Sequence, residues 1–451
     1  MSSEPPALHS EPALPPVRLA QATLFWFKLG WISFGGPAGQ IAIMHQELVE
    51  RRRWISERRF LHALNYCMLL PGPEAQQLAT YLGWLMHRVP GGLIAGLLFV
   101  LPSFFILCAL AWGYLLFGQQ SWVAALFYGI KPAVVAIVMH AAWRVGQRTL
   151  KTPLAWSLAI AAFLAVFVFA IPFPYVVLGA ALMGWWVKPS TRATDNHAVA
   201  DHSDKPIRAA LIDDHSSTPE HLRYSHMRLI KTCSIAAALW LLPMLVLFAL
   251  AGGGHDLIAL AWFFTKAALL TFGGAYAVLP YVYQGAVEHH AWLSPTQMID
   301  GLALGETTPG PLIMVVSFVG FVAGYQQAWF GPEQAWLAGA AAAMVVTWFT
   351  FLPSFFFIFA GGPWVESSRR QPRLQAPLSA ITAAIVGVIL NLGCFFALHT
   401  FWPKGLAESP EWPAMVLAGL ALIALFGLRR SVLEVIVLSA ALGGGYIALW
   451  H

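Results

Sequence analysis

The chain has 451 residues, of which 58% are hydrophobic and 10% are charged, and its mean hydropathy is +0.66. A soluble domain carries about 25% charged residues, so this composition excludes an ordinary soluble protein and favours one that lies in a bilayer. The net charge of +5 does not indicate a nucleic-acid partner, because the basic residues occupy short loops between apolar segments. Four isolated cysteines without CxxC or Cys/His spacing predict no disulfide, no metal site and no cofactor.

In chain order, residues 1–19 are polar and proline-rich and predict a disordered tail rather than a signal peptide. Residues 20–187 form a first repeat, and 188–231 form a polar cytoplasmic linker whose histidines lack metal-ligand spacing. A connecting transmembrane helix is expected at 232–250, and a second repeat at 251–451. The segments expected to cross the bilayer fully are 91–117, 123–142, 154–170, 175–187, 232–250, 335–362, 377–400, 414–428 and 431–450.

Short motifs recur in the two halves in the same order. Lys28 and Lys266 lie 238 positions apart (266 − 28), and the same offset relates the two FGG motifs and the two PGP motifs. The sequence LPSFF at 101–105 recurs at 352–356, so the second half carries about thirteen more loop residues. Motifs in register over this length indicate an internal duplication.

The basic residues predict that the two repeats have opposite orientations in the membrane. The loop after the first FGG segment carries five arginines, whereas the matching loop of the second half has no Lys or Arg. Because cytoplasmic loops concentrate positive charge, the same loop is expected inside once and outside once. We therefore expect an all-α polytopic membrane protein with two inverted repeats of about six hydrophobic segments each, plus the connecting span. The FGG segments (20–44, 258–283) and PGP segments (61–86, 298–327) are expected to be broken helices, either re-entrant or spanning.

These breaks predict an anion site near the membrane midplane. Glycine pairs and prolines free backbone groups that lipid cannot satisfy, so breaks persist where they line a protein or water-filled cavity. Each new half-helix presents free N–H groups and a partial charge of about +0.5. Pro37 and Pro73 suit the first turn of such helices. Four helix N-termini around a pseudo-two-fold axis would form a cradle for an anion.

Charged and polar side chains near the breaks are further candidates. An intramembrane lysine costs about 2.5–3.5 kcal/mol, so Lys28 and Lys266 are expected near the anion, with snorkelling to the interface as the alternative. Glu74 and Glu306 are candidates for coupling or gating, although Glu74 could simply cap a helix. Gln76 and Gln77 could donate hydrogen bonds to substrate or pack between helices.

The ordered motifs resemble those of the chromate transporter family, in its long, fused two-half form. The resemblance extends from about Leu24 to the C-terminus outside the linker. It rests on FGGPAGQIAIMHQELVE (34–50), LLPGPEAQQLATYLGWLMHR (69–88), LPSFF (101–105), LLTFGGAYAVLPYV (269–282), WLSP (292–295) and GETTPGPL (305–312). It implies a secondary transporter in the inner membrane that expels chromate and confers resistance. The family signature falls on Phe34, Gly35, Gly36, Pro71, Gly72, Pro73, Phe272, Gly273, Gly274, Pro309, Gly310 and Pro311. Ala275 stands where the first half has Pro37, so the two half-sites can differ.

Other functions remain open at this point. A carrier of sulfate or a related oxyanion is the nearest alternative, since charge and size barely separate these ions. An intramembrane enzyme would need a catalytic motif, and the sequence has no HExxH, GxSxG or P-loop, so we expect no enzyme. A non-transporting membrane sensor would leave the helix breaks unexplained. The sequence leaves the coupling ion, the transport direction and a homodimer undecided.

Overall fold

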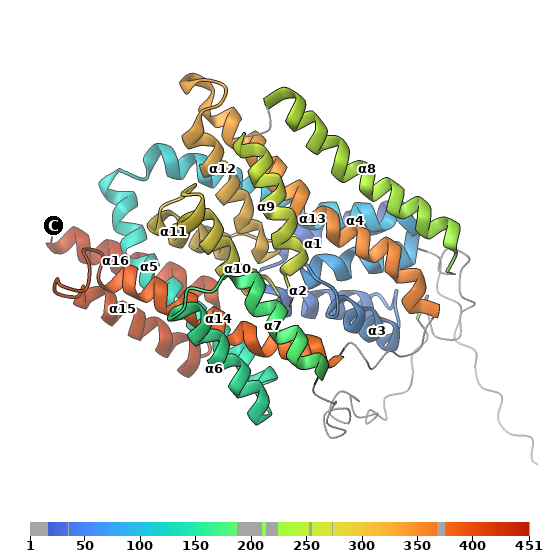
Figure 1. The fold of residues 1–451 in the computed structure, drawn as a ribbon, viewed down its shortest axis with the longest axis horizontal. Helices are drawn as coiled ribbons and strands as arrows, with labels where there is room; N and C mark the ends of the chain where they lie inside the picture. The colour runs from blue at the N-terminus through green and yellow to red at the C-terminus, as the bar shows by residue number, and fades with distance from the viewer. Residues whose placement is uncertain are drawn as a thin grey trace, which may run out of the picture.

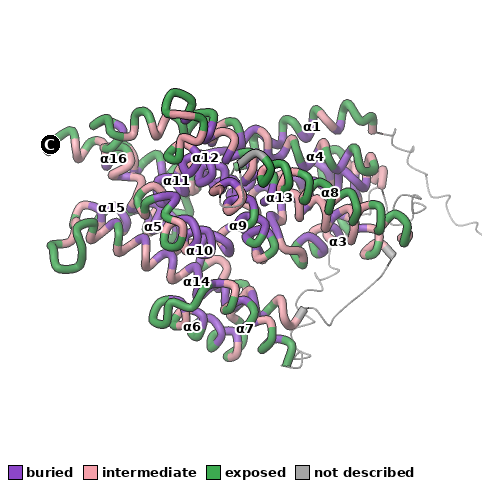
Figure 2. Tube along the Cα trace, turned by 45° about the horizontal axis from the view of Figure 1, so that its top comes forward, coloured by how far each residue is buried: buried purple, intermediate pink, exposed green. Residues whose placement is uncertain are grey.

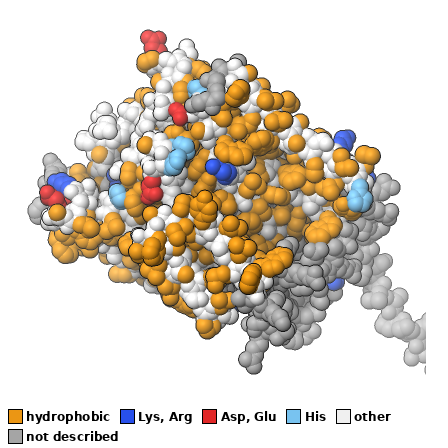
Figure 3. Space-filling model, viewed as in Figure 1, with side chains coloured by type: hydrophobic (Ala, Val, Ile, Leu, Met, Phe, Trp, Pro, Cys, Tyr) orange, Lys and Arg blue, Asp and Glu red, His pale blue; other side chains and the backbone are white. Residues whose placement is uncertain are grey.

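The computed structural model describes residues 17–34, 36–186, 210–212, 224–251, 255–272, 274–367 and 375–450. These residues are almost entirely helical, and their only β-type pairing is one isolated bridge between Ile55 and Ile212 (Figure 1). Six of the described helices are long and apolar enough to cross a membrane, and four shorter apolar helices accompany them. The visible face of the molecule is mostly hydrophobic (Figure 3), as lipid contact requires. The protein is therefore an all-α multi-pass membrane protein, as the composition predicts.

The first half begins with three short α-helices, continues with two long ones and ends with two shorter ones. Its elements are α1 (Leu19–Ile32), α2 (Gly36–His45), the π-helix η1 (Gln46–Arg51), α3 (Glu57–Cys67), α4 (Glu74–Phe117), α5 (Ser121–Thr149), α6 (Pro153–Phe167) and α7 (Phe173–Trp186). The long helix α8 (His226–Ala251) follows and runs along one edge of the molecule (Figure 1).

The second half repeats this order. Its elements are α9 (Asp256–Leu270), α10 (Ala275–Tyr283), the π-helix η4 (Gln284–His289), α11 (Pro295–Thr307), the 3₁₀ turn η5 (Leu312–Met314), α12 (Val315–Gln327), the 3₁₀ turn η6 (Pro332–Gln334), α13 (Ala335–Ser367), α14 (Gln375–Phe401), α15 (Trp412–Leu422), the π-helix η8 (Ile423–Gly427) and α16 (Val432–Trp450). The π-helices η1 and η4 begin and end 238 positions apart, as do the first residues of α3 and α11. The duplication in the sequence therefore has a counterpart, element by element, in the backbone.

Matching caps explain why α3 and α11 begin where they do. Ser56 Oγ accepts the amide of Arg59 at 3.3 Å, and Ser294 Oγ accepts the amide of Gln297 at 3.1 Å. Each serine satisfies one of the amides that the first turn of a helix leaves without a partner. The Trp-x-Ser motif that recurs in the two halves is thus a helix-start signal.

The helix α4 is a hairpin rather than one long rod. Its backbone leaves the helical region at His87 and Arg88, and Arg88 has φ +57°. A Cβ on Gly83 would lie 2.4 Å from the carbonyl oxygen of Gly91, so the parts before and after the bend pack antiparallel at van der Waals distance. In the second half α12 packs against α13 in the same way, since a Cβ on Gly324 would lie 2.3 Å from the Ala338 oxygen. In each half, the helix that directly follows the PGP motif therefore packs antiparallel against the next long helical segment of the chain.

Three segments predicted as full spans form shorter helices. The predictions at 154–170, 175–187 and 414–428 correspond to α6 with 15 residues, α7 with 14, and α15 with its π-helical extension. The described part of each is shorter than the about 20 residues of a perpendicular crossing, and the description of α7 stops at Trp186. The described residues cover only 210–212 and 224–231 of the predicted linker, and α8 begins inside its last part.

The most buried parts of the chain are the helices that follow the PGP motifs. Every residue from Val315 to Gly324 in α12 is buried, and so is every residue from Ala75 to Leu85 in α4. Figure 2 shows this buried region at the middle of the molecule, with exposed residues around it. The repeated breaks therefore lie at the centre of the protein, where polar groups need partners.

Candidate functional site

Each FGG break follows a helix whose last turn is closed by a buried hydroxyl side chain. Ser33 at the end of α1 and Thr271 at the end of α9 each donate to the backbone carbonyl one turn earlier, at 2.6 and 2.7 Å. Both side chains are fully buried. Because the helices end here, the carbonyl groups of Ser33 and Thr271 themselves have no intrahelical partner.

The PGP bends supply those partners, and they do so across the two halves. Gly72 donates its N–H to the Thr271 oxygen at 2.7 Å, and Gly310 donates its N–H to the Ser33 oxygen at 2.8 Å. The two glycines have φ +128° and +95°, in the region that side chains rarely adopt, so glycine is needed at both bends. Each PGP bend is therefore bound to the FGG break of the other half.

We call the region in which each PGP bend is hydrogen-bonded to the FGG break of the other half the crossing. Two glutamines make further hydrogen bonds there. Gln40 Nε2 donates to the Gly310 oxygen at 2.6 Å and to the Ser33 oxygen at 3.3 Å, while Gln77 Nε2 donates to the Pro71 oxygen at 2.7 Å. Carbonyl oxygens only accept, so these bonds fix which way each amide faces. Both side chains are fully buried, and both Oε1 atoms have no hydrogen-bond partner.

The sequence identified Gln77 and missed Gln40. The available signal was a glutamine inside an apolar run, four residues after Gly36. Gln76, also a candidate, is fully buried, and its Nε2 donates to Thr80 Oγ1 at 3.1 Å within α4.

The first turn of α4 directly follows the first PGP bend, and its first three amides have no backbone partner among the described residues. Pro73 precedes this helix and makes no side-chain cap, and its oxygen first accepts an amide from Gln77. The hydrogen bonds of the described residues include none from the amides of Glu74, Ala75 and Gln76. Such a turn is a ready-made anion site, because its N–H groups and the helix dipole both favour negative charge.

The two candidate carboxylates have different surroundings. Glu306 accepts a hydrogen bond from Tyr276, the second residue of α10. Glu74 is half-buried at the start of α4. The cations that act on them electrostatically both lie on α5, Arg144 on Glu306 and Arg148 on Glu74. The four-residue spacing puts these arginines on one face of the helix.

The structure places Lys28 and Lys266 on exposed faces of α1 and α9. Lys28 shares its face with the exposed apolar side chains of Phe27 and Trp31. Lys266 Nζ lies 5.9 Å from the ring centre of Trp262, which is itself half exposed. This surrounding favours snorkelling of the ammonium groups towards an interface. Neither lysine is among the described contacts of the crossing.

The other signature residues divide by burial. Gly72, Pro73, Gly274, Pro309, Gly310 and Pro311 are buried, Gly36, Pro71 and Phe272 are half-buried, and Phe34 is 38% exposed. Gly35 and Gly273 lie outside the described residues.

Sequence reasoning missed a buried ion pair that joins the two halves. Arg59 of α3 forms a salt bridge with Glu366 near the end of α13, and Tyr81 donates to the same carboxylate. His62 Nδ1 lies 3.9 Å from Glu366. The Glu366 side chain is only 4% exposed, so its charge depends on these partners.

A second polar group occupies the related place in the other half. Asp300 of α11, the residue 238 positions after His62, accepts a hydrogen bond from Tyr114 Oη at 2.9 Å. Lys131 Nζ lies 3.8 Å from its other carboxylate oxygen. Tyr114 belongs to α4 and Lys131 to α5, so this group also crosses between the halves. Within the described part of the chain, no cluster of three or more His, Cys, Asp or Glu side chains could hold a metal ion.

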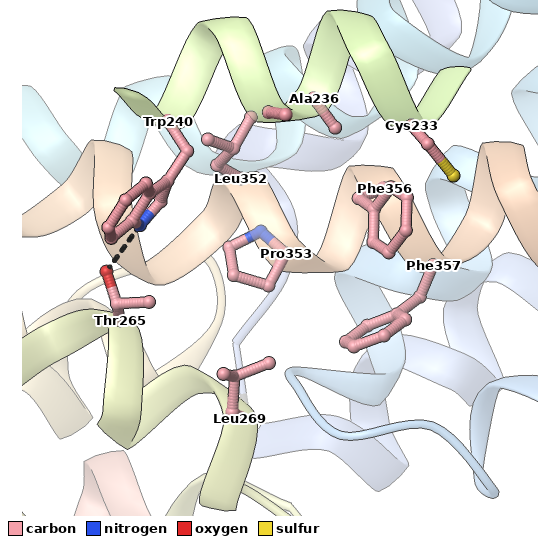
Figure 4. Close-up of a pocket in the computed structure, with 10 residues that line it drawn as sticks. Cys233, Ala236, Trp240, Thr265, Leu269, Leu352, Pro353, Phe356 and Phe357 are labelled. Atoms are coloured by element: carbon pink, nitrogen blue, oxygen red, sulfur yellow. Dashed lines mark hydrogen bonds between the residues drawn. The ribbon is translucent and has the colours of Figure 1, made fainter. Parts of the chain in front are cut away.

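An apolar cavity of about 380 Å³ lies between α8, α9 and α13 (Figure 4). Trp240 of α8 closes one side by donating its indole N–H to Thr265 Oγ1 at 3.0 Å. Pro353 and Phe356 of α13 also line the cavity. A lining of this kind cannot replace the hydration of a dianion, so the cavity does not suit an anion.

Comparison with known proteins gives the same family as the motifs. The family model described as "Chromate transporter" matches residues 20–185 and 258–444. The "Chromate transport protein" of Pseudomonas aeruginosa is 31% identical over 385 residues, covering 84% of this chain and 81% of the relative. The "Probable chromate transport protein" of Synechococcus elongatus is 29% identical over 441 residues, 97% of each chain. The "Chromate transport protein" of Cupriavidus metallidurans is 28% identical over 393 residues, 86% of each. No solved structure matches the chain. The chain belongs to the chromate transporter family.

Proposed function

We propose that this protein is a secondary transporter that exports chromate across the inner membrane and thereby confers chromate resistance, with no enzymatic step. The names of its full-length relatives support the substrate. The pair of hydrogen bonds exchanged between the PGP bends and the FGG breaks carries the proposal, because it brings the helix breaks of both halves together inside the protein. Buried amides beside such a crossing suit a tetrahedral dianion.

In this proposal the two repeats have opposite orientations, and the anion binds where their breaks cross. The linker and the N-terminus are cytoplasmic, on the same side as the arginines between α2 and α3. Movement of one repeat against the other opens the crossing first to one side and then to the other. Glu74 and Glu306 are the groups proposed to couple transport to protons, and Lys28 and Lys266 contribute positive charge outside the crossing.

A carrier of sulfate or a related oxyanion is the second candidate. Neutral N–H donors recognise the charge and tetrahedral shape of an anion rather than its central atom, and sulfate shares both with chromate. Export and resistance distinguish the two candidates in the cell, since a sulfate carrier would not lower chromate accumulation.

The test is uptake of chromate into inside-out membrane vesicles, with the membrane potential and the pH gradient imposed separately. We expect uptake that depends on the protein and on one of these gradients, and cells that express the protein should accumulate less chromate. Uptake equal to that of empty vesicles would refute chromate transport. The Lys28→Ala/Lys266→Ala double variant is expected to weaken uptake most at low ionic strength, because screening removes attraction between distant charges. Wild-type uptake in that variant at low salt would exclude both lysines from the transport path.

A further inference from the structure

The serines of the two LPSFF motifs are buried without any hydrogen bond. Ser103 of α4 and Ser354 of α13 stand at equivalent positions of the two halves and are 0% and 1% exposed. The Oγ atom of each has no hydrogen-bond partner. Two related positions share this feature, which is unusual because buried hydroxyl groups are normally paired.

Several buried hydroxyl groups of the described residues donate within their own helix, whereas Thr400 Oγ1 has no partner. Those of Thr347 and Thr350, on the same helix as Ser354, donate to the carbonyl one turn earlier at 2.7 Å. Ser33 does so at 2.6 Å. The two LPSFF serines could use the same arrangement and do not. Their hydroxyl groups are left available for something else.

Each serine lies against the PGP bend of the other half. A Cβ built on Gly72 would be 2.5 Å from Ser354 Oγ, and a Cβ built on Gly310 would be 2.8 Å from Ser103 Cβ and 3.4 Å from its Oγ. The PGP bends are also the points where the two halves exchange hydrogen bonds. Both free hydroxyl groups are therefore at the crossing of the breaks.

Unpaired amides follow directly after both bends. After the first bend they belong to residues 74–76, and after the second to Leu312 and Ile313, which are 4% and 1% exposed. The crossing thus has two related half-sites, each with a helix start from one repeat and a serine from the other. All of these donors are uncharged, so together they can bind a dianion without trapping it as a fixed cation would.

We propose that Ser103 and Ser354 donate hydrogen bonds to the transported tetrahedral oxyanion, one from each repeat. This inference rests on the proposed oxyanion site and adds two residues to it. Ser→Ala variants distinguish a structural serine from one that binds substrate, because the first role affects stability and the second affects anion affinity. Removing an unpaired hydroxyl group from the interior leaves stability unchanged or raises it, whereas the bound anion loses a donor.

The experiment measures equilibrium binding of chromate, sulfate and molybdate to the purified full chain in detergent, together with its apparent melting temperature. Ser103→Ala and Ser354→Ala should each weaken binding about 10- to 100-fold, the loss expected for one hydrogen bond to a charged group. The melting temperature should not fall. Ser→Thr at either position keeps the hydroxyl group and should retain more affinity than Ser→Ala.

Ser317→Ala is the matched control. Ser317 of α12 is fully buried like the other two, but its hydroxyl group is paired with Thr347 Oγ1 at 2.9 Å. This variant should lose stability and keep its affinity. Wild-type affinity in both LPSFF variants, or a loss of affinity that merely follows a lower melting temperature, would overturn the inference.

The three anions separate this inference from the proposed function. If the protein binds sulfate or molybdate but not chromate, and the serine variants weaken that binding, the inference stands and chromate transport fails. If the wild-type chain binds none of the three anions, both are refuted.

Discussion

The variant Gly310→Ala tests the geometry of the crossing most directly. The new Cβ would lie 2.8 Å from Ser103 Cβ and 3.3 Å from the Phe99 oxygen. A Cβ atom and a backbone oxygen cannot rotate aside, so the backbone of α4 or of the bend has to move. Such overpacking costs about 1–3 kcal/mol. The residue also has φ +95°, and forcing a side chain into that conformation costs about another 1–3 kcal/mol.

We therefore expect Gly310→Ala to destabilise the protein by about 2–6 kcal/mol. Two control variants separate the contributions. Gly274→Ala keeps the unfavourable φ of +97° but would meet no atom within 4 Å, so it should show the backbone cost alone. Gly113→Ala, inside α4, would meet no atom and has ordinary helical geometry, so it should be neutral or stabilising by about 0.5–1 kcal/mol.

The assay is unfolding of the purified protein in detergent, followed by the fluorescence of its 20 tryptophans. The expected order of stability is Gly113→Ala, then Gly274→Ala, then Gly310→Ala. If Gly310→Ala is as stable as Gly113→Ala, the PGP bend does not pack against α4 as described. Equal losses for Gly274→Ala and Gly310→Ala would show that the steric contribution is absent.

Three further variants test other contacts. Glu366→Gln should destabilise the protein by about 3–5 kcal/mol in the same unfolding assay, because Arg59 would lose its buried charged partner; no loss would contradict a buried ion pair. Tyr276→Phe removes the hydrogen bond to Glu306 and should cost about 1.5–3 kcal/mol while leaving the backbone unchanged; unchanged stability would mean that this contact does not form. Ile212→Pro removes an amide that donates to the loop after η1 at 3.1 Å, and hydrogen exchange of that loop should become faster. Unaltered exchange would show that the loop is held by its own contacts.

Much of the fold could be predicted from the sequence because helix breaks in lipid have few causes. Glycine and proline inside an apolar run predict where α1, α3, α9 and α11 end, since the freed backbone groups need protein partners. The repeated offset predicts that the second half copies the first. The bend in α4 at His87 and Arg88 also falls where the sequence separates the PGP segment 61–86 from the span 91–117, just before the Pro-Gly-Gly at 90–92. The sequence does not show how closely the two arms pack, because that depends on the contact between Gly83 and Gly91.

The site was only partly predictable, for a physical reason. The outward face of a membrane helix is as apolar as its inward face, so the sequence of α1 does not reveal which way Lys28 points. Its neighbours at three- and four-residue spacing, such as Leu24 and Trp31, turn out to be exposed as well. Gln40 and the LPSFF serines contact the PGP bends of the other half. No pattern within one half indicates which residue of the other half lies opposite.

The exchange of hydrogen bonds at the crossing has an energetic consequence. A carrier must visit two conformations that differ by only a few kcal/mol, or one of them would never be populated. Each repeat donates one equivalent hydrogen bond to the other. A conformational change that swaps the positions of the two repeats therefore keeps the same number of these bonds, and on this count the two conformations have nearly equal free energies. The glutamines break this balance, because Val278 and Val315 stand where the other repeat has Gln40 and Gln77. We expect these unmatched side chains to decide in which direction the empty protein faces at rest.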